Sequence, residues 1–145
     1  MARAQLIDDK LTDSVIGAFY EVYNVLGFGF LEHVYIAAME RELRSRNHLV
    51  HREVGVRVKY KGDHLCSYRL DMLIDEKLIV EVKSSTNLPP TVVRQLHNYL
   101  KATDLELGLI LHFGPEPMFY RRILTNDKKA FRSSARASVS IREDP

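Results

Sequence analysis

A segment near the middle of the chain predicts a hairpin that carries charged side chains inside two otherwise apolar strands. Polar and apolar residues alternate over much of residues 67–74, residues 78–83 are mostly apolar, and residues 75–77 are polar enough to turn the chain between them. Alternation with a period of two is typical of a strand that turns one face toward a core. Any fold of this chain must therefore contain a sheet that accommodates these charges.

The charges in the predicted hairpin are Asp71 on the first strand and Glu81 and Lys83 on the second. Because side chains alternate between the two faces of a strand, Glu81 and Lys83 should share a face with Ile79. A charge that is buried without a partner is strongly destabilising or is neutralised by a shifted pKa. An ion pair between Lys83 and one of the acids would meet this need, and so would a divalent cation held by Asp71 and Glu81. The spacing alone leaves both interpretations open.

The composition indicates an ordinary globular protein of one domain. The chain has 145 residues, of which 46% are hydrophobic and 28% charged, and this length allows a substantial core. No apolar run approaches the ~18 residues that a membrane span needs. The first residues reach Asp8 and Asp9 too early for a secretory signal. We therefore predict a cytoplasmic protein without a membrane segment.

Charge is distributed unevenly along the chain. Seven basic and three acidic residues lie from Arg121 onward, a net +4, so that residues 1–120 carry −2 of the overall +2. Non-specific affinity for nucleic acid comes mostly from neutralising phosphates, so the acidic body alone should bind it weakly. This charge does not exclude a nuclease, because acids that hold metal ions contribute to it. The basic end could act as a tether, although a solvated tail is the commoner explanation.

Hydrophobic periodicity predicts the order α-α-β-β-β-α-β-β in a single α/β domain, with helices flanking a mixed sheet. A continuous apolar run is typical of a central strand that is covered on both faces, and Thr91 is a candidate N-cap. We predict a domain over residues 9–124 and a flexible, polar and basic tail over 125–145. The expected elements are helices at 9–26, 30–47 and 91–102 and strands at 54–60, 67–74, 78–83, 107–113 and 118–124.

Two helix motifs place further polar side chains beside apolar ones. Glu32 and Tyr35 are three residues apart near the start of the second helix, and Gln95 and Tyr99 are one turn apart on the third. A glutamate in a first helical turn is often there because of the helix dipole, and a tyrosine on a core-facing stripe is most often a packing residue. Taken singly, neither pair indicates a function.

Other candidate groups are weaker. His48 and His51 are three residues apart with no third ligand nearby, and we interpret them as an incidental pair rather than part of a zinc site. Cys66 is the only cysteine, so it cannot form an intrachain disulfide. We interpret it as a buried structural thiol rather than a nucleophile.

Together these residues resemble the PD-(D/E)xK nuclease superfamily, and within it the small bacterial group called GxxExxY proteins. The naming motif of that group stands here as Gly29–Tyr35, with Glu32 at its centre. The superfamily signature stands as Asp71 followed by Glu81-Val82-Lys83, with Leu70 where a proline is usual. Gln95 to Tyr99 is similar to the QxxxY motif of the RecB-like exonuclease branch. The resemblance extends from about residue 11 to residue 124 and implies a restriction-endonuclease-like fold.

The resemblance implies a role for each residue near the acids. Asp71 and Glu81, with the carbonyl of Val82, would hold Mg²⁺ or Mn²⁺. Lys83 would orient or deprotonate the attacking water and stabilise charge on the scissile phosphate. Glu32 would be an additional ligand or a supporting acid.

The helix residues have implied roles further from the reacting atoms. Gln95 and Tyr99 would support the site and approach the nucleic-acid strand. Tyr35 would pack against the site or support it from behind.

The predicted function is a metal-dependent nuclease that hydrolyses phosphodiester bonds of nucleic acid, with DNA as the expected substrate, without strong sequence specificity. RNA remains an alternative substrate, since the hydrolytic chemistry is the same. The alternative function is a non-catalytic module on the same fold that binds nucleic acid or a protein. The acidic body favours a protein partner that supplies substrate affinity, and an exposed edge strand could support a homodimer.

Overall fold

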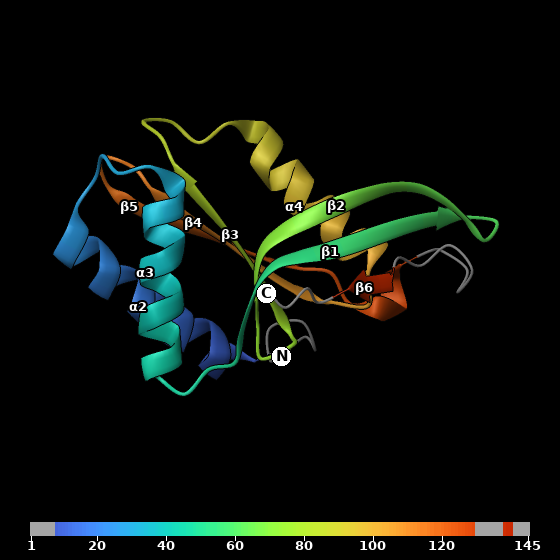
Figure 1. The fold of residues 1–145 in the computed structure, drawn as a ribbon, viewed down its shortest axis with the longest axis horizontal. Helices are drawn as coiled ribbons and strands as arrows, with labels where there is room; N and C mark the ends of the chain where they lie inside the picture. Colours follow the sequence, from blue (N-terminus) through green and yellow to red (C-terminus); the bar gives the residue numbers. More distant parts are fainter. Residues whose placement is uncertain (1–7, 130–137, 141–145) are drawn as a thin grey trace.

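The computed structural model describes residues 8–129 and 138–140, which form one mixed sheet with helices on both faces (Figure 1). The strands lie in the order β5-β4-β3-β2-β1-β6. Helices α2 and α3 cover one face and α4 covers the other. The elements are α2 (Asp9–Leu26), α3 (Glu32–Ser45), β1 (Val50–Tyr60), β2 (Asp63–Ile74), β3 (Leu78–Ser84), α4 (Pro90–Ala102), β4 (Leu107–Phe113), β5 (Pro117–Ile123), the 3₁₀ helix η1 (Asn126–Lys128) and β6 (Ser138–Ser140).

The predicted α/β domain and its order of elements are confirmed, and the sheet has one strand more than predicted. Strand β1 begins at Val50, four residues before the start expected from alternation alone. Helix α4 begins at Pro90 with Pro89 as its N-cap, so Thr91 is not the N-cap. The reason is that proline has no N–H to satisfy and a φ already suited to a helix, so it favours the first helical position.

The apolar side chains of β3 divide between two cores. Leu78, Val80 and Val82 pack with α2 and α3, whereas Ile79 packs with α4. Strand β4 runs parallel to β3 and is buried along its whole length. A parallel pair needs a crossover connection, and α4 provides it. The predicted face of Glu81 and Lys83 is thus the face that α4 covers.

Halfway along the β1–β2 ribbon, side chains of the same parity switch from one face of the sheet to the other. Val50 packs with α2 and α3, but Val54 and Val56, which have the same parity, pack with α4. The change occurs at Glu53, a non-glycine residue with φ of 54°, which is an uncommon conformation inside a strand. On β2, Met72 and Ile74 pack with α2 and α3, whereas Leu70 packs with α4.

Asp71 therefore lies where β2 changes face, across from the distorted position of β1. The strand pairs on either side are Arg52 with Met72 and Val54 with Leu70. Beyond this point the ribbon continues past the helices toward its turn (Figure 1). Cys66 lies in that distal part and is exposed, so the expectation of a buried thiol is wrong. The prediction failed because no helix covers this part of the ribbon, and an alternating sequence pattern does not reveal that.

The segment after β5 contributes to the fold where the structure describes it. Thr125 and Lys129 are buried, and the Lys129 ammonium donates hydrogen bonds of 2.8 Å to the carbonyl oxygens of Thr103 and Leu105. Strand β6 pairs with β1 over Gly55–Arg57. The rest of the predicted tail lies outside the described residues. In the part of the chain that is described, no helix is long and apolar enough to cross a membrane.

Candidate active site

The two acids of the predicted hairpin meet where the pairing of β2 with β3 ends. The last pair of the register is Met72 with Val80. Beyond this pair, the acceptor on β2 is a side chain instead of a main-chain carbonyl: the Val82 N–H donates to Oδ2 of Asp71 at 2.9 Å. The Asp71 N–H is 3.4 Å from Oε1 of Glu81, a long hydrogen bond. The strands thus separate at Asp71, and the two carboxylates occupy the space between them.

Glu81 is the most deeply buried acid of this group, with 4% of its surface exposed. Burial raises the pKa of the Glu81 carboxyl well above its ordinary value, and the negative charge of Asp71 raises it further. The positive charge of Lys83 opposes this shift without reversing it. A buried carboxyl beside a second one is electrostatically unfavourable when both are ionised, and an additional positive charge between them would relieve the repulsion.

A divalent cation fits the donor set that these two residues present. Both offer carboxylate oxygens, the ligand type that hard cations such as Mg²⁺ and Mn²⁺ prefer. Within the described residues there is no cluster of three or more His, Cys, Asp or Glu side chains. Such an ion would then be held by one or two carboxylates and several waters, which suits Mg²⁺.

Lys83 lies at the rim of the sheet and contacts the upstream helix. Its ammonium is 3.9 Å from Oε1 of Glu32, the first residue of α3. The two side chains are 27% and 43% exposed. Beside them, the Ser84 hydroxyl donates to the carbonyl of Phe30 at 2.5 Å, which ties the start of α3 to the end of β3. Glu32 thus meets the site through Lys83 and does not join the two carboxylates in one cluster.

Helix α4 brings Tyr99 close to the carboxylates. Tyr99 is 3% exposed, and its pKa is raised by burial and then by the charges of Glu81 and Asp71. Gln95, one turn earlier on α4, is exposed. Tyr68 reaches the same place from β2, with its ring 5.3 Å from that of Tyr99. Sequence reasoning missed Tyr68, because simple alternation from Met72 puts it on the face away from α4.

Tyr35 lies on the other side of the sheet and takes part in packing. Its ring is fully buried and stacks on Phe113 at 4.0 Å between centroids. Its hydroxyl donates to the carbonyl of Gly27 at 2.5 Å and accepts from the N–H of Phe30 at 3.2 Å. Tyr35 thereby holds the loop that leads into α3, and so sets the position of Glu32.

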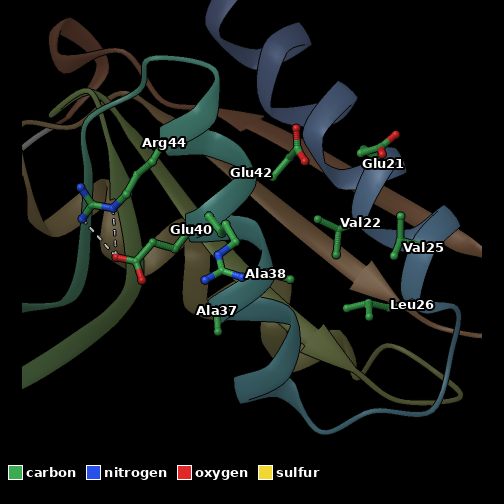
Figure 2. Close-up of a pocket in the computed structure, with 10 residues that line it drawn as sticks. Glu21, Val22, Val25, Leu26, Ala37, Ala38, Glu40, Glu42 and Arg44 are labelled. Carbon is green, nitrogen blue, oxygen red and sulfur yellow. Dashed lines mark hydrogen bonds and ion pairs between the residues drawn. The ribbon is translucent and has the colours of Figure 1, made fainter.

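A cavity of about 800 Å³ lies away from this site, between α2 and α3, on the face of the sheet away from α4 (Figure 2). Two of its three acids are paired, Glu40 with Arg44 and Arg52, and Glu42 with Arg46. Apolar side chains of both helices make up much of the wall. This cavity is a groove between two helices, so we take the carboxylates as the candidate active site.

A Ser–His–Asp arrangement was also missed by sequence reasoning. Nε2 of His48 is 2.7 Å from the Ser14 hydroxyl, and its Nδ1 is 2.7 Å from Oδ2 of Asp75. Oδ1 of Asp75 accepts the Leu49 N–H at 2.8 Å. Ser14 lies within helix α2, and none of these three hydrogen-bonded residues lines the cavity between α2 and α3. The arrangement ties α2 to the β2–β3 turn, and His48 is therefore a structural residue rather than an incidental one.

This tie predicts an acid-dependent loss of stability in Asp75→Asn. Burial alone would raise the Asp75 pKa, but the hydrogen bonds from His48 and Leu49 outweigh burial and lower it. A lowered folded pKa contributes stability above the unfolded pKa of about 3.9 that is lost as pH falls through the folded value. Asp75 is about one-third exposed, so we expect the variant to lose about 1 kcal/mol at neutral pH. Urea unfolding at pH 7 and pH 3 measures this, and a loss that is equal at both values would contradict it.

Comparison with known proteins places the whole of this arrangement in one family. A family model described as the PD-(D/E)XK nuclease superfamily matches residues 9–123. The crystal structure of SSO0001 is similar in fold, with a TM-score of 0.51 and 21% sequence identity over 87% of this chain. The matched region spans 64% of the length of that protein. A comparison with curated proteins gave no match. The chain belongs to the PD-(D/E)XK nuclease superfamily.

Proposed function

We propose that this protein is a metal-dependent nuclease that hydrolyses phosphodiester bonds of DNA without strong sequence specificity. The observation that carries the proposal is the contact between Asp71 and the buried Glu81, with Lys83 on the same strand. Membership of a nuclease superfamily supports phosphodiester hydrolysis, and its members generally use divalent metals. A fold that served only for packing would gain little from two carboxylates in contact, because their repulsion opposes folding.

The proposed metal ligands are the carboxylates of Asp71 and Glu81 and the main-chain carbonyl of Val82. A bound Mg²⁺ or Mn²⁺ would lower the pKa of a coordinated water and polarise the phosphoryl oxygen. Asp71 is held in place by the Val82 N–H, so its orientation does not depend on a ligand. Such pre-organisation reduces the cost of assembling the site when substrate binds.

Lys83 and Glu32 are proposed to act together at the rim of the site. The Lys83 ammonium is partly exposed and would orient the attacking water and offset negative charge on the scissile phosphate. Glu32 faces that ammonium at 3.9 Å, and we assign it as a positioning residue for Lys83. Gln95 and Tyr99 of α4 would contact the nucleic-acid strand beside the carboxylates.

The arrangement of the helices supports the proposal of weak sequence specificity. Helices α2 and α3 pack on one face of the sheet and α4 on the other, so the described residues include no separate unit that would read base edges. Contacts with the phosphate backbone position a nucleic acid without reading its sequence.

Cleavage of end-labelled DNA tests the proposal directly. We expect the purified protein to degrade single- or double-stranded DNA with Mg²⁺ or Mn²⁺, to stop on addition of EDTA and to resume when excess metal is restored. The product ladder distinguishes attack at an end from attack within the strand. Absence of cleavage of both DNA and RNA with either metal, from a protein shown to be folded, would reject this function and favour a binding module.

A further inference from the structure

A second cavity lies between α4 and the β1–β2 ribbon, on the face of the sheet that α4 covers. Its volume is about 320 Å³, a size in the range of small-ligand sites. Five of its residues recur on one side of α4 at helical spacing, and Tyr68 of β2 forms the opposite wall. The lining residues are Tyr68, Thr91, Arg94, Gln95, Asn98 and Tyr99.

Three polar side chains of this cavity have no hydrogen-bond or ion-pair partner within the described residues. Arg94, Gln95 and Asn98 are exposed, and in residues 8–129 and 138–140 none of their side chains makes a hydrogen bond or an ion pair. The two amides can each donate and accept. The guanidinium can bind a phosphate through two parallel hydrogen bonds. The cavity therefore offers a ligand hydrogen-bond donors, hydrogen-bond acceptors and one positive charge.

The aromatic wall is held in a fixed position. Tyr68 is half-buried and packs against the α4 core, and its ring is tilted at 57° to that of Tyr99. Tyr68 faces α4 because the ribbon changes face at Asp71, where the sheet also separates around the carboxylates. The same distortion of the backbone thus forms both the acid site and this wall.

The cavity lies on the face of the sheet that carries Glu81. Tyr99 lines the cavity and packs in the same core as Ile79, which is two residues before Glu81 on the same face of β3. A nucleotide whose phosphate reached the carboxylates could therefore extend its neighbour into the cavity. The combination of an aromatic face, two amides and a guanidinium is the set of groups by which proteins hold an unstacked base and its phosphate.

We propose that this cavity receives an unstacked nucleobase next to the scissile phosphate, which makes single-stranded nucleic acid the preferred substrate. The inference rests on the proposed nuclease function and names its substrate class. Tyr68 stacks on the base, Gln95 and Asn98 hydrogen-bond to its edge, and Arg94 binds the adjoining phosphate. A base within a duplex is stacked on both faces and must be flipped out to enter, which costs binding energy that a single strand does not lose.

Binding by a cleavage-deficient protein tests this without dependence on turnover. Asp71→Asn serves as the background, and fluorescence anisotropy measures its affinity for a labelled 20-nucleotide strand and for the matching duplex. Tyr68→Leu should weaken single-strand binding about tenfold, since each stacked base contributes that much or more, while Tyr68→Phe should retain it. Asn98→Ala, an exposed change that cannot unfold the core, should weaken it several-fold. Duplex binding should change little in all three variants.

Two controls identify the base as the ligand. Tyr60→Leu removes an exposed tyrosine at the far end of β1 and should leave binding unchanged. A strand of the same length built from abasic nucleotides should bind the Asp71→Asn background about as weakly as the intact strand binds Tyr68→Leu, and Tyr68→Leu should not weaken it further. If Tyr68→Leu loses affinity equally for single strand and duplex, or equally for intact and abasic strands, the proposed base-binding role of the cavity is rejected.

The outcomes separate this inference from the nuclease function on which it rests. If the wild-type protein cleaves DNA but Tyr68→Leu and Asn98→Ala bind single strands normally, the pocket is rejected and the nuclease stands. If single-strand binding depends on Tyr68 but the wild-type protein cleaves nothing, the pocket stands and the nuclease is rejected. Single-stranded RNA in the same assay shows whether the pocket requires a deoxyribose.

Discussion

Asp71→Asn is expected to lower the rate of metal-dependent cleavage by a factor on the order of 10² to 10³ while leaving the folded protein intact. Asparagine keeps an oxygen that can accept the Val82 N–H, so the hydrogen bond of 2.9 Å at the end of the β2–β3 ladder is retained. The negative charge that would hold a cation is lost. The same change removes repulsion from Glu81, so the free energy of unfolding should stay the same or rise.

Asp75→Asn is the matched control for this variant. It makes the same chemical change four residues further along the chain, where the carboxylate bonds to His48 and Leu49 instead of facing Glu81. We expect this control to cleave DNA normally and to lose stability, the reverse of Asp71→Asn. Cleavage rates and urea unfolding of both proteins under the same conditions measure the contrast. If Asp71→Asn unfolds while cleaving at the normal rate per folded molecule, Asp71 is a structural residue.

Much of the fold could be predicted because local patterns and tertiary packing agree over most of the chain. The strand at Leu107–Phe113 is confirmed residue for residue, since an unbroken apolar run has few alternatives to a central parallel strand. The helix Asp9–Leu26 is confirmed equally well, because its apolar stripe ends at a glycine that takes a φ of 69°. Strand β6 was not predicted, because a segment of three residues, Ser-Val-Ser, is too short to show a periodicity.

The acid site could be anticipated because Glu81 lies within an apolar strand, where a charge needs a reason. Tyr68 of β2 could not be found in the same way. Its position against α4 depends on Glu53, whose φ of 54° changes the face of the ribbon, and no residue type at that position signals the change. The His48 contacts were hidden for a similar reason, since they join residues 34 and 27 positions apart.

The burial of Glu81 leads to the second large effect. Glu81→Gln should be more stable than the wild-type protein without metal at neutral pH, and less stable than it with metal. Because the pKa of the folded carboxyl is raised, its favourable contribution is complete below the unfolded pKa of about 4.3 and is lost as pH rises toward the folded value. Glutamine cannot ionise. In EDTA at pH 7.5 we therefore expect Glu81→Gln to be more stable than the wild-type protein by about 1–2 kcal/mol, with the difference vanishing near pH 4.

Metal should reverse that order, because an ion that binds only the folded state stabilises it by mass action. At a free concentration 100 times the dissociation constant this amounts to about 2.7 kcal/mol, and Glu81→Gln should gain far less than the wild-type protein. Thermal unfolding in EDTA and in saturating Mn²⁺ measures both effects without any nucleic acid. Glu76→Gln, the same change at an exposed position of the β2–β3 turn, should alter neither. A Glu81→Gln protein less stable than the wild type in EDTA would mean that the carboxylate has a structural partner; such a partner would account for the buried charge without a metal.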